Sequence, residues 1–116
     1  MNIKRFHVGS RMSDMAVHGG TIYLAGQVAD DVSQDIAGQT KQVLATIDKL
    51  LAEGGSDKTK ILSTTIYIAD MANFSAMNAV WDGWVAQGNT PPRATVQAQL
   101  AKPAYLVEIT VIAAAV

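Results

Sequence analysis

The sequence contains no cysteine, which excludes disulfide bridges, thiolate catalysis and cysteine-ligated metal centres. It has no excess of either charge: the formal net charge is −1, so the basic footprint of a nucleic-acid-binding protein is missing. It has no apolar run long enough to span a membrane, and residues 1–5 lead into strand-like sequence without a signal-peptide core. We therefore expect a cytoplasmic protein that binds neither membranes nor nucleic acid.

What the chain has in quantity is apolar side chains, which make up 49% of its 116 residues. No polar tract divides the sequence, so residues 1–116 are expected to form one domain. A domain of this size buries only about two-thirds of the surface of its unfolded chain. Part of the apolar surface is then left uncovered in a monomer, which favours a homo-oligomer.

The hydrophobic period changes several times along the chain. Alternation predicts strands at 3–8, 16–18, 21–27, 60–69, 93–100 and 106–114. Helical spacing predicts two amphipathic helices, one from Asp35 to 53 that ends at Gly54 and Gly55, and one capped by Asp70 that ends at Gly88. This order indicates an α+β fold in which both helices cover one face of a mixed sheet. We expect another subunit to cover the second face.

Arg93 follows two prolines and opens an alternating segment. Proline restricts both its own backbone and that of the residue before it, so the arginine is held at the mouth of a strand. A guanidinium is a planar fork of donors that matches a carboxylate, and the neighbouring sequence offers no acidic partner. Two interpretations stay open at this point: a carboxylate-binding residue, or a surface arginine that caps a strand or bridges subunits.

Glu108 lies between Val107 and Ile109 in the most apolar predicted strand. Unless this face is exposed, its carboxylate needs a partner, and a carboxylate in a cleft can act as a general acid or base. A salt bridge or an exposed strand glutamate is the alternative. In a tight hairpin, Glu108 and Arg93 are several residues out of register, so a shared site requires an intervening strand or a neighbouring subunit.

Other candidate site residues give weaker indications of a function. His7 and His18 are isolated, with no further ligand at metal spacing, so no metal site is expected. Trp81 and Trp84 fall on the apolar stripe of the second helix, which indicates core or interface anchors. In the predicted strand 60–69, alternation places Leu62 on one face with Ile66 and Ile68.

Several segments together resemble the RidA/YjgF family over essentially the whole chain. They are, in order, 22–27, 39–44, 64–67, 70–71, 74–79, 92–93 and 107–109. Segments 11–14 and 81–85 resemble the YoaB-like branch of that family. The resemblance implies a chorismate-mutase-like fold of the βαββαβ type that forms a homotrimer with three clefts between subunits.

The resemblance also implies roles for individual residues. Arg93 matches the arginine that grips the substrate carboxylate, and Glu108 matches the acidic residue that orients water at the imine carbon. Asn78, Gly26 and Thr95 match residues that line the cleft.

One position departs from the family pattern. Met12 stands where the best-known members have a tyrosine, and the adjacent Arg11 adds a second cation to the expected cleft. Both residues belong to the expected substrate-binding set. The departure at position 12 bears on which substrate the protein uses.

The implied activity is the hydrolysis of reactive enamines and imines, such as 2-aminoacrylate and 2-iminopropanoate, to a 2-keto acid and ammonia. No cofactor is expected, because an imine carbon is already electrophilic and positioning contributes most of the catalysis. The first alternative is a non-catalytic regulatory module that binds a small carboxylate. The second is the endoribonuclease or translation-inhibitor activity described for some relatives, which the absent basic surface disfavours.

Overall fold

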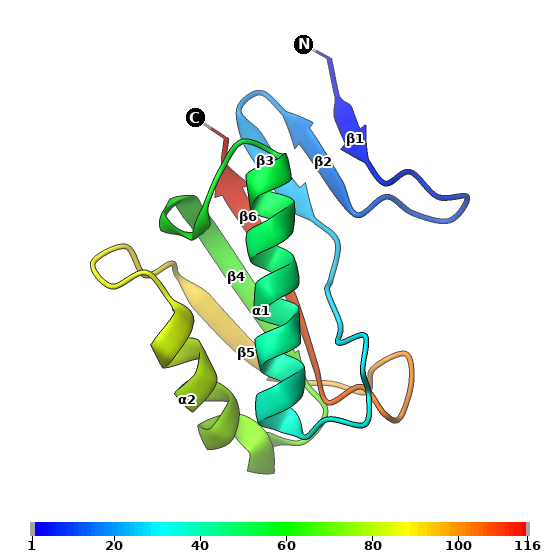
Figure 1. The fold of residues 1–116 in the computed structure, drawn as a ribbon, viewed down its shortest axis with the longest axis vertical. Helices are drawn as coiled ribbons and strands as arrows, with labels where there is room; N and C mark the ends of the chain where they lie inside the picture. Colours follow the sequence, from blue (N-terminus) through cyan, green and yellow to red (C-terminus); the bar gives the residue numbers. More distant parts are fainter. Residues whose placement is uncertain (1, 116) are drawn as a thin grey trace.

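The computed structural model describes residues 2–115 and shows two layers, a twisted sheet and a pair of helices (Figure 1). Along the chain the order is three strands, a helix, a strand, a second helix and two strands, as expected. The strands are β1 (Lys4–Phe6), β2 (Met15–His18), β3 (Thr21–Leu24), β4 (Ile61–Ile68), β5 (Arg93–Gln97) and β6 (Val107–Ala114). The helices are α1 (Ile36–Glu53) and α2 (Phe74–Trp84), with single 3₁₀ turns at Lys58–Lys60 and Met71–Asn73.

The sheet is mixed, and its strand order is β1-β2-β3-β6-β4-β5. Only β4 and β5 run parallel; the other neighbours are antiparallel. The order places β4 between β5 and β6, so the strands that carry Arg93 and Glu108 are not adjacent. Gly19 and Gly20 join β2 to β3 with φ of 59° and 78°, a turn that side chains with a Cβ rarely tolerate.

Helix α1 begins and ends as its sequence predicts. The Asp35 side chain accepts a hydrogen bond of 2.9 Å from the Gly38 backbone N–H, which satisfies one free donor of the first turn. At the other end Gly55 has φ of 81°, and the Ser56 N–H donates to the Leu51 carbonyl at 2.8 Å. The apolar stripe between these caps is buried against the sheet.

Helix α2 is shorter than predicted. Asp70 caps the separate 3₁₀ turn, where its side chain accepts from the Ala72 N–H at 2.9 Å, and α2 begins only at Phe74. The helix ends at Trp84 and not at Gly88, because Val85 adopts an extended backbone (φ −59°, ψ 141°). The helical spacing of the apolar residues 71, 74, 77, 81, 84 and 85 predicts one buried stripe. Met77 and Trp81 are buried as this spacing predicts, whereas Met71 is 41% exposed.

The predicted face of Leu62 is wrong. A β-bulge shifts the register of β4 against β6 between Ile61 and Ser63. Since one extra residue reverses the alternation, Ile61, Ile66 and Ile68 are buried while Leu62 is half exposed.

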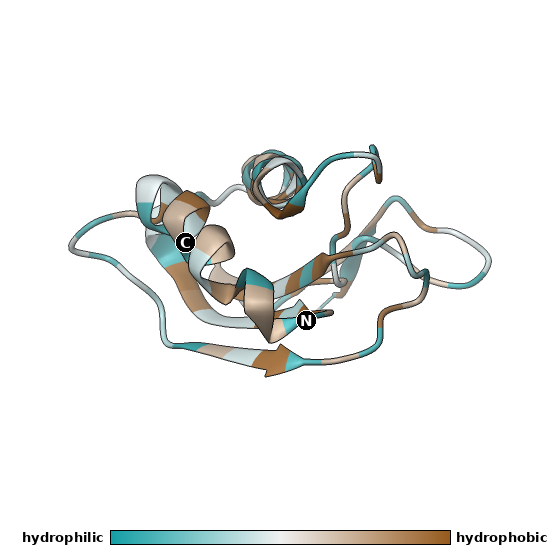
Figure 2. Ribbon diagram, turned by 90° about the horizontal axis from the view of Figure 1, so that it is seen from below, coloured by the Kyte–Doolittle hydropathy of each residue, from teal (hydrophilic) through white to brown (hydrophobic). Residues whose placement is uncertain are grey.

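Both helices lie on one side of the sheet, as predicted, and in the described part of the chain no helix covers the other side (Figure 2). The uncovered side carries large apolar side chains: Tyr23, Leu62, Val96 and Ile112 are 48, 50, 45 and 37% exposed. We refer to this surface as the open face. No helix within residues 2–115 has the length and apolar character needed to cross a membrane.

Candidate functional site

Glu108 lies on the open face at the start of β6. The β4–β6 register pairs it with Tyr67, whereas its neighbours Val107 and Ile109 point to the helices and are buried. Beyond β3, the chain continues along β6 through two backbone hydrogen bonds between Gln27 and Ile109, of 2.8 and 3.1 Å. This bridge brings Gly26 directly against the Glu108 side chain.

The contact between Gly26 and Glu108 leaves no space for a side chain at position 26 unless the Glu108 carboxylate moves. A Cβ added to Gly26 would overlap the carboxylate oxygen Oε2 of Glu108 and lie 2.8 Å from its Cδ. The Glu108 carboxylate therefore packs directly against the backbone of Gly26. The two residues line an open cavity of about 480 Å³ together with Tyr67, Thr110 and the segment from Ala98 to Ala101.

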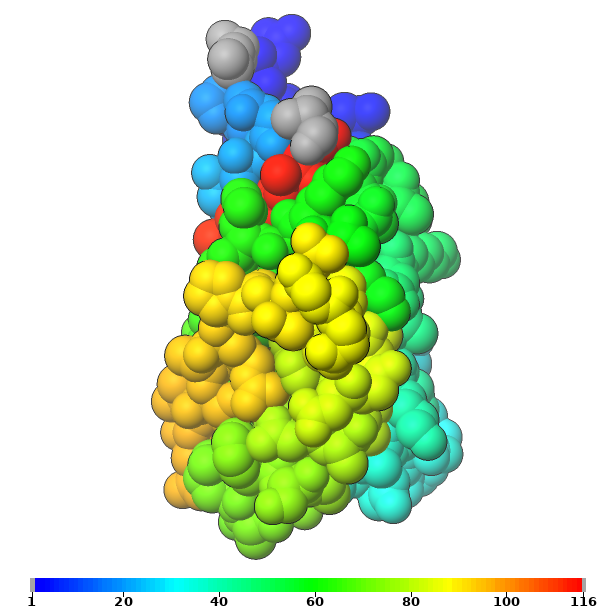
Figure 3. Space-filling view, turned by 90° about the vertical axis from the view of Figure 1, so that its left-hand side faces the viewer, coloured from blue at the N-terminus to red at the C-terminus, as the bar shows by residue number. Residues whose placement is uncertain are grey.

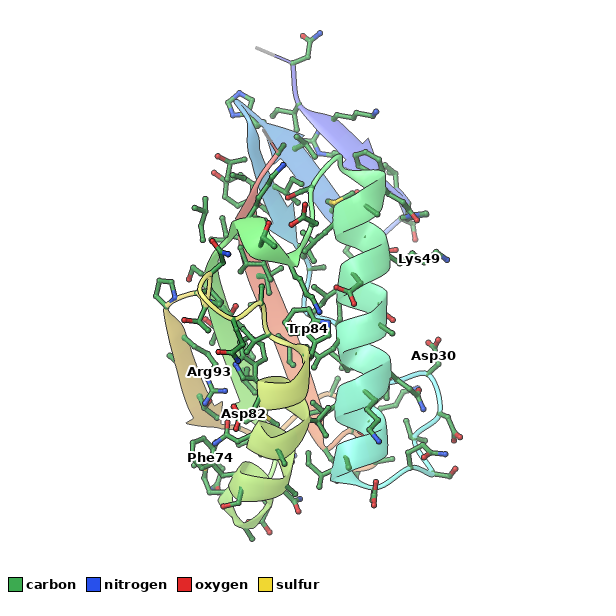
Figure 4. The ribbon with its side chains drawn as sticks, turned by 60° about the vertical axis from the view of Figure 1, so that its left-hand side comes forward. Asp30, Lys49, Phe74, Asp82, Trp84 and Arg93 are labelled. Carbon is green, nitrogen blue, oxygen red and sulfur yellow. The ribbon has the colours of Figure 1, made fainter. Side chains whose placement is uncertain are left out.

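Arg93 lies on the other side of the sheet. It pairs with the buried residue Thr64 at the start of the parallel β4–β5 ladder, and its guanidinium carbon is 5.3 Å from the centre of the Trp81 ring on α2. Figure 3 shows β5 and α2 next to one another, and Figure 4 shows Arg93 beside the helix. Such stacking holds the guanidinium plane and leaves its N–H edges free to donate.

The surroundings of Arg93 contain unused hydrogen-bonding capacity. Within residues 2–115 the single ion pair joins His7 and Glu53, so no carboxylate there neutralises Arg93. Three buried oxygens between α2 and the sheet have no hydrogen-bond partner: Thr64 Oγ1, Asn78 Oδ1 and Thr95 Oγ1. Buried polar atoms are rarely left unpaired. Two of these three residues, Asn78 and Thr95, belong to the set that the sequence resemblance pointed to.

Arg11 and Met12 do not line the cavity beside Glu108, but their loop leads to Asp14, whose carbonyl accepts a hydrogen bond of 2.9 Å from the Ala25 N–H next to Gly26. They belong to the loop between β1 and β2, where the Gly9 N–H donates to the Met12 carbonyl at 2.9 Å. Both side chains are exposed, Met12 by 55%. The strand order places this loop at one edge of the sheet and β5 at the opposite edge.

One chain thus presents the seven predicted residues as three separate groups. Arg93, Asn78 and Thr95 lie on the helix side at the β5 edge, and Gly26 and Glu108 lie on the open face. Arg11 and Met12 lie at the β1–β2 edge. In a single chain, the sheet itself separates the arginine from the glutamate.

The sequence did not indicate two further residues of these groups. Trp81 was predicted only as an anchor; it is 5% exposed and also carries the Arg93 guanidinium. Tyr67 lies beside Glu108 only because of the β4–β6 register, which no local pattern reveals. No group of three or more potential metal ligands occurs within residues 2–115.

Comparison with known proteins identifies the family of this chain. Residues 3–115 match the family model described as endoribonuclease L-PSP. The chain is 45% identical to the RutC family protein YoaB of Escherichia coli over 114 residues, which covers 98% of this chain and 99% of that protein. It is 32% identical to a rat 2-iminobutanoate/2-iminopropanoate deaminase over 80% of this chain and 72% of that protein.

A solved structure agrees in fold. It is that of NMB1025 from Neisseria meningitidis, titled a member of the YjgF protein family, which superposes with a TM-score of 0.96 at 46% identity and covers 98% of this chain and 95% of that one. The resemblance to the RidA/YjgF family and its YoaB-like branch is confirmed. The chain belongs to the endoribonuclease L-PSP family, which is also called the RutC or YjgF family in the names of the relatives above.

Proposed function

We propose that this protein hydrolyses small 2-imino acids to 2-keto acids and ammonia, in clefts formed between the subunits of a homotrimer. The observation that carries the proposal is a free arginine and a cavity-lining glutamate that lie on opposite sides of one sheet. Because a small substrate cannot reach both within one chain, the complete site combines Arg93 of one subunit with Glu108 of another.

The open face supports assembly of this kind. It exposes Tyr23, Val96 and Ile112 on a surface that no described helix covers. Exposed apolar patches of this type mark protein–protein interfaces, and a closed ring of identical subunits buries the same face on each copy. The loop with Arg11 and Met12 leads to Asp14, which is hydrogen-bonded to Ala25 next to Gly26, so this loop borders the Glu108 side of the cleft.

The residues suit each step of the hydrolysis. The Arg93 guanidinium donates two parallel hydrogen bonds to the substrate carboxylate and fixes the C=N group in the cleft. Glu108 accepts a hydrogen bond from water and then its proton, while the water oxygen forms a bond to the imine carbon and the imine nitrogen takes a proton from solvent. Glu108 then gives its proton to the amino group. As the C–N bond breaks and ammonia leaves, Glu108 takes the hydroxyl proton, the C=O bond of the 2-keto acid forms, and that proton returns to solvent.

Two other groups refine the site. The Gly26 backbone keeps the Glu108 carboxylate at the cavity wall, where no side chain competes for the space. The unpaired Asn78 and Thr95 oxygens lie on the arginine side, where they can accept hydrogen bonds from the guanidinium or the substrate. The named activity of the rat relative supports the same chemistry for this chain.

The deciding experiment generates 2-iminobutanoate in situ from threonine with a dehydratase and follows 2-oxobutanoate release with and without the protein. Glu108→Gln keeps the size of the side chain but cannot accept the proton, so the rate should fall by at least about a hundredfold. Glu53→Gln is the matched control, because Glu53 pairs with His7 outside the cavity. No acceleration by the wild-type protein, or equal rates for the two variants, contradicts the proposal.

A non-catalytic carboxylate-binding module is the second candidate, and Met12 is the observation that favours it. A thioether cannot supply the phenol hydroxyl that the family pattern places at this position. This candidate expects 2-oxobutanoate to bind in an Arg93-dependent manner while imine hydrolysis stays at the uncatalysed rate.

A further inference from the structure

A second cavity lies between the two helices, on the surface of the helix layer. It has a volume of about 710 Å³, within the range of about 300–1,000 Å³ that small-molecule sites occupy. Small residues of both helices give it room: Ala45 on α1, and Ala76, Ala79 and Gly83 on α2. We call this cavity the helix groove.

The upper end of the helix groove is built around Trp84, which Figure 4 shows between the two helices. The indole Nε1–H donates to Asp48 Oδ2 on α1 at 2.9 Å. Lys58 lies on the other side of the tryptophan, with its Nζ 2.6 Å from the Trp84 carbonyl oxygen and 5.2 Å from the ring centre. These contacts fix an aromatic wall and a cation at the same end of the groove.

The charge of the groove is not balanced. Its lining contains two lysines, Lys41 and Lys58, and a single carboxylate, Asp48. Within residues 2–115 neither lysine forms an ion pair, because Asp48 is bound to the indole and the one ion pair there lies elsewhere. The groove therefore offers an apolar floor, an aromatic wall and a net charge of about +1.

We propose that the helix groove binds a small amphipathic carboxylate, a molecule with an aromatic or aliphatic body and one anionic head. The body covers the alanines and the part of Trp84 that lines the groove, and the head lies between Lys41 and Lys58. This site is separate from the proposed catalytic cleft, because Arg93 is on the sheet side of α2 and does not line the groove. The proposal does not depend on the imine hydrolysis.

The test uses the two tryptophans as local probes. Their indole N–H groups give separate signals in a ¹⁵N–¹H correlation spectrum; Trp84 lines the groove and Trp81 lies next to Arg93. Titration with 4-phenylbutyrate should shift the Trp84 signal saturably and by more than the Trp81 signal, which responds only through the contact between the two rings, whose centres are 5.3 Å apart. The uncharged 4-phenylbutan-1-ol should bind about two- to fivefold more weakly, as expected for an exposed charge pair.

Variants localise the site. Lys41→Gln should weaken 4-phenylbutyrate binding about two- to fivefold, because Lys41 lines the groove and its removal leaves no broken hydrogen bond in the structure. Lys49→Gln is the matched control: it removes the same charge from the same helix, and Figure 4 shows Lys49 directed away from α2. Ala79→Leu fills the groove and should abolish the Trp84 shift in a folded protein.

Several results would overturn the proposal. One is a Trp84 signal that does not respond to 4-phenylbutyrate, and another is equal affinity for 4-phenylbutyrate and 4-phenylbutan-1-ol. The others are equal effects of Lys41→Gln and Lys49→Gln on binding, and undiminished binding of 4-phenylbutyrate to Ala79→Leu. A Trp84 signal that changes with protein concentration but not with the probe would instead assign the groove to a second copy of the chain. Pyruvate serves as the reference ligand for the Arg93 cleft, where it should shift Trp81, so failure of one site is distinguished from failure of the other.

Discussion

Gly26→Ala tests whether the exact position of the Glu108 carboxylate controls turnover. The new Cβ would lie 2.8 Å from Glu108 Cδ and 3.0 Å from its Cγ, and it would overlap Oε2. Since ordinary contact begins near 3.4 Å, the Cδ must retreat by about 0.6 Å and the carboxylate oxygen must move further. Gly26 does not have a positive φ, so the alanine adds no backbone strain.

The expected effect is on catalysis and not on folding. Misplacement of a reacting group by about 1 Å can reduce a rate about a hundredfold, whereas moving the flexible end of a half-buried glutamate should cost less than about 1 kcal/mol of unfolding free energy. The assay is 2-oxobutanoate release from 2-iminobutanoate, with kcat and KM measured beside the melting temperature of the same sample. We expect kcat to fall by about tenfold to a hundredfold, with a melting temperature within a few degrees of wild type.

Gly83→Ala provides the control, because a Cβ at that helical position meets nothing within 4 Å. It should leave turnover unchanged and stabilise α2 by up to about 1 kcal/mol. The double variant Gly26→Ala with Glu108→Gln gives the sharper test: if Gly26 acts only through Glu108, the alanine adds no further loss. A full additional loss in the double variant, or wild-type turnover in Gly26→Ala, refutes the reasoning.

Three further predictions concern binding, assembly and acid stability. Arg93→Ala should stay folded and lower kcat/KM by about 10- to 150-fold, because a charge-assisted hydrogen bond contributes about 1.5–3 kcal/mol. Arg93→Lys should recover little of this loss, because an ammonium group cannot form two parallel hydrogen bonds to a carboxylate. Steady-state kinetics on both variants test these expectations. Sedimentation equilibrium should give a trimer, which Ile112→Lys on the open face converts to an inactive monomer while Val32→Lys, an equally exposed loop position, does not. Hydrogen bonds from the Thr59 hydroxyl and backbone N–H lower the pKa of Asp57 below its ordinary 3.8. These hydrogen bonds therefore stabilise the folded protein above pH 3.8, and this contribution is lost as the pH falls through the folded-state pKa of Asp57. Melting curves should therefore show Asp57→Asn less stable than wild type at pH 7, with the difference shrinking as the pH falls through the folded-state pKa of Asp57. A difference independent of pH contradicts this assignment.

Local rules were sufficient for most of the secondary structure. Asp35 and the glycine after α1 mark the ends of that helix because capping depends only on backbone groups within one turn. The paired glycines at 19 and 20 predict their hairpin for the same reason, since a positive φ is a property of the residue itself. Alternation also identifies Glu108 correctly as a residue on the face opposite to Val107 and Ile109.

Errors arose where neighbours in space decide the outcome. The bulge that exposes Leu62 depends on how β4 pairs with β6. A local sequence pattern contains no information on this bulge, because it results from contacts between segments that are distant along the chain.

The candidate site shows the same division. Residue types and order along the chain singled out Arg93 and Glu108 as the residues with useful chemistry, and their roles stay a prediction. Only the tertiary structure shows that these two side chains lie on opposite sides of the sheet and that Trp81 supports the guanidinium. The face that a strand residue occupies follows from its register with neighbouring strands, and register is set by the packing of the whole domain.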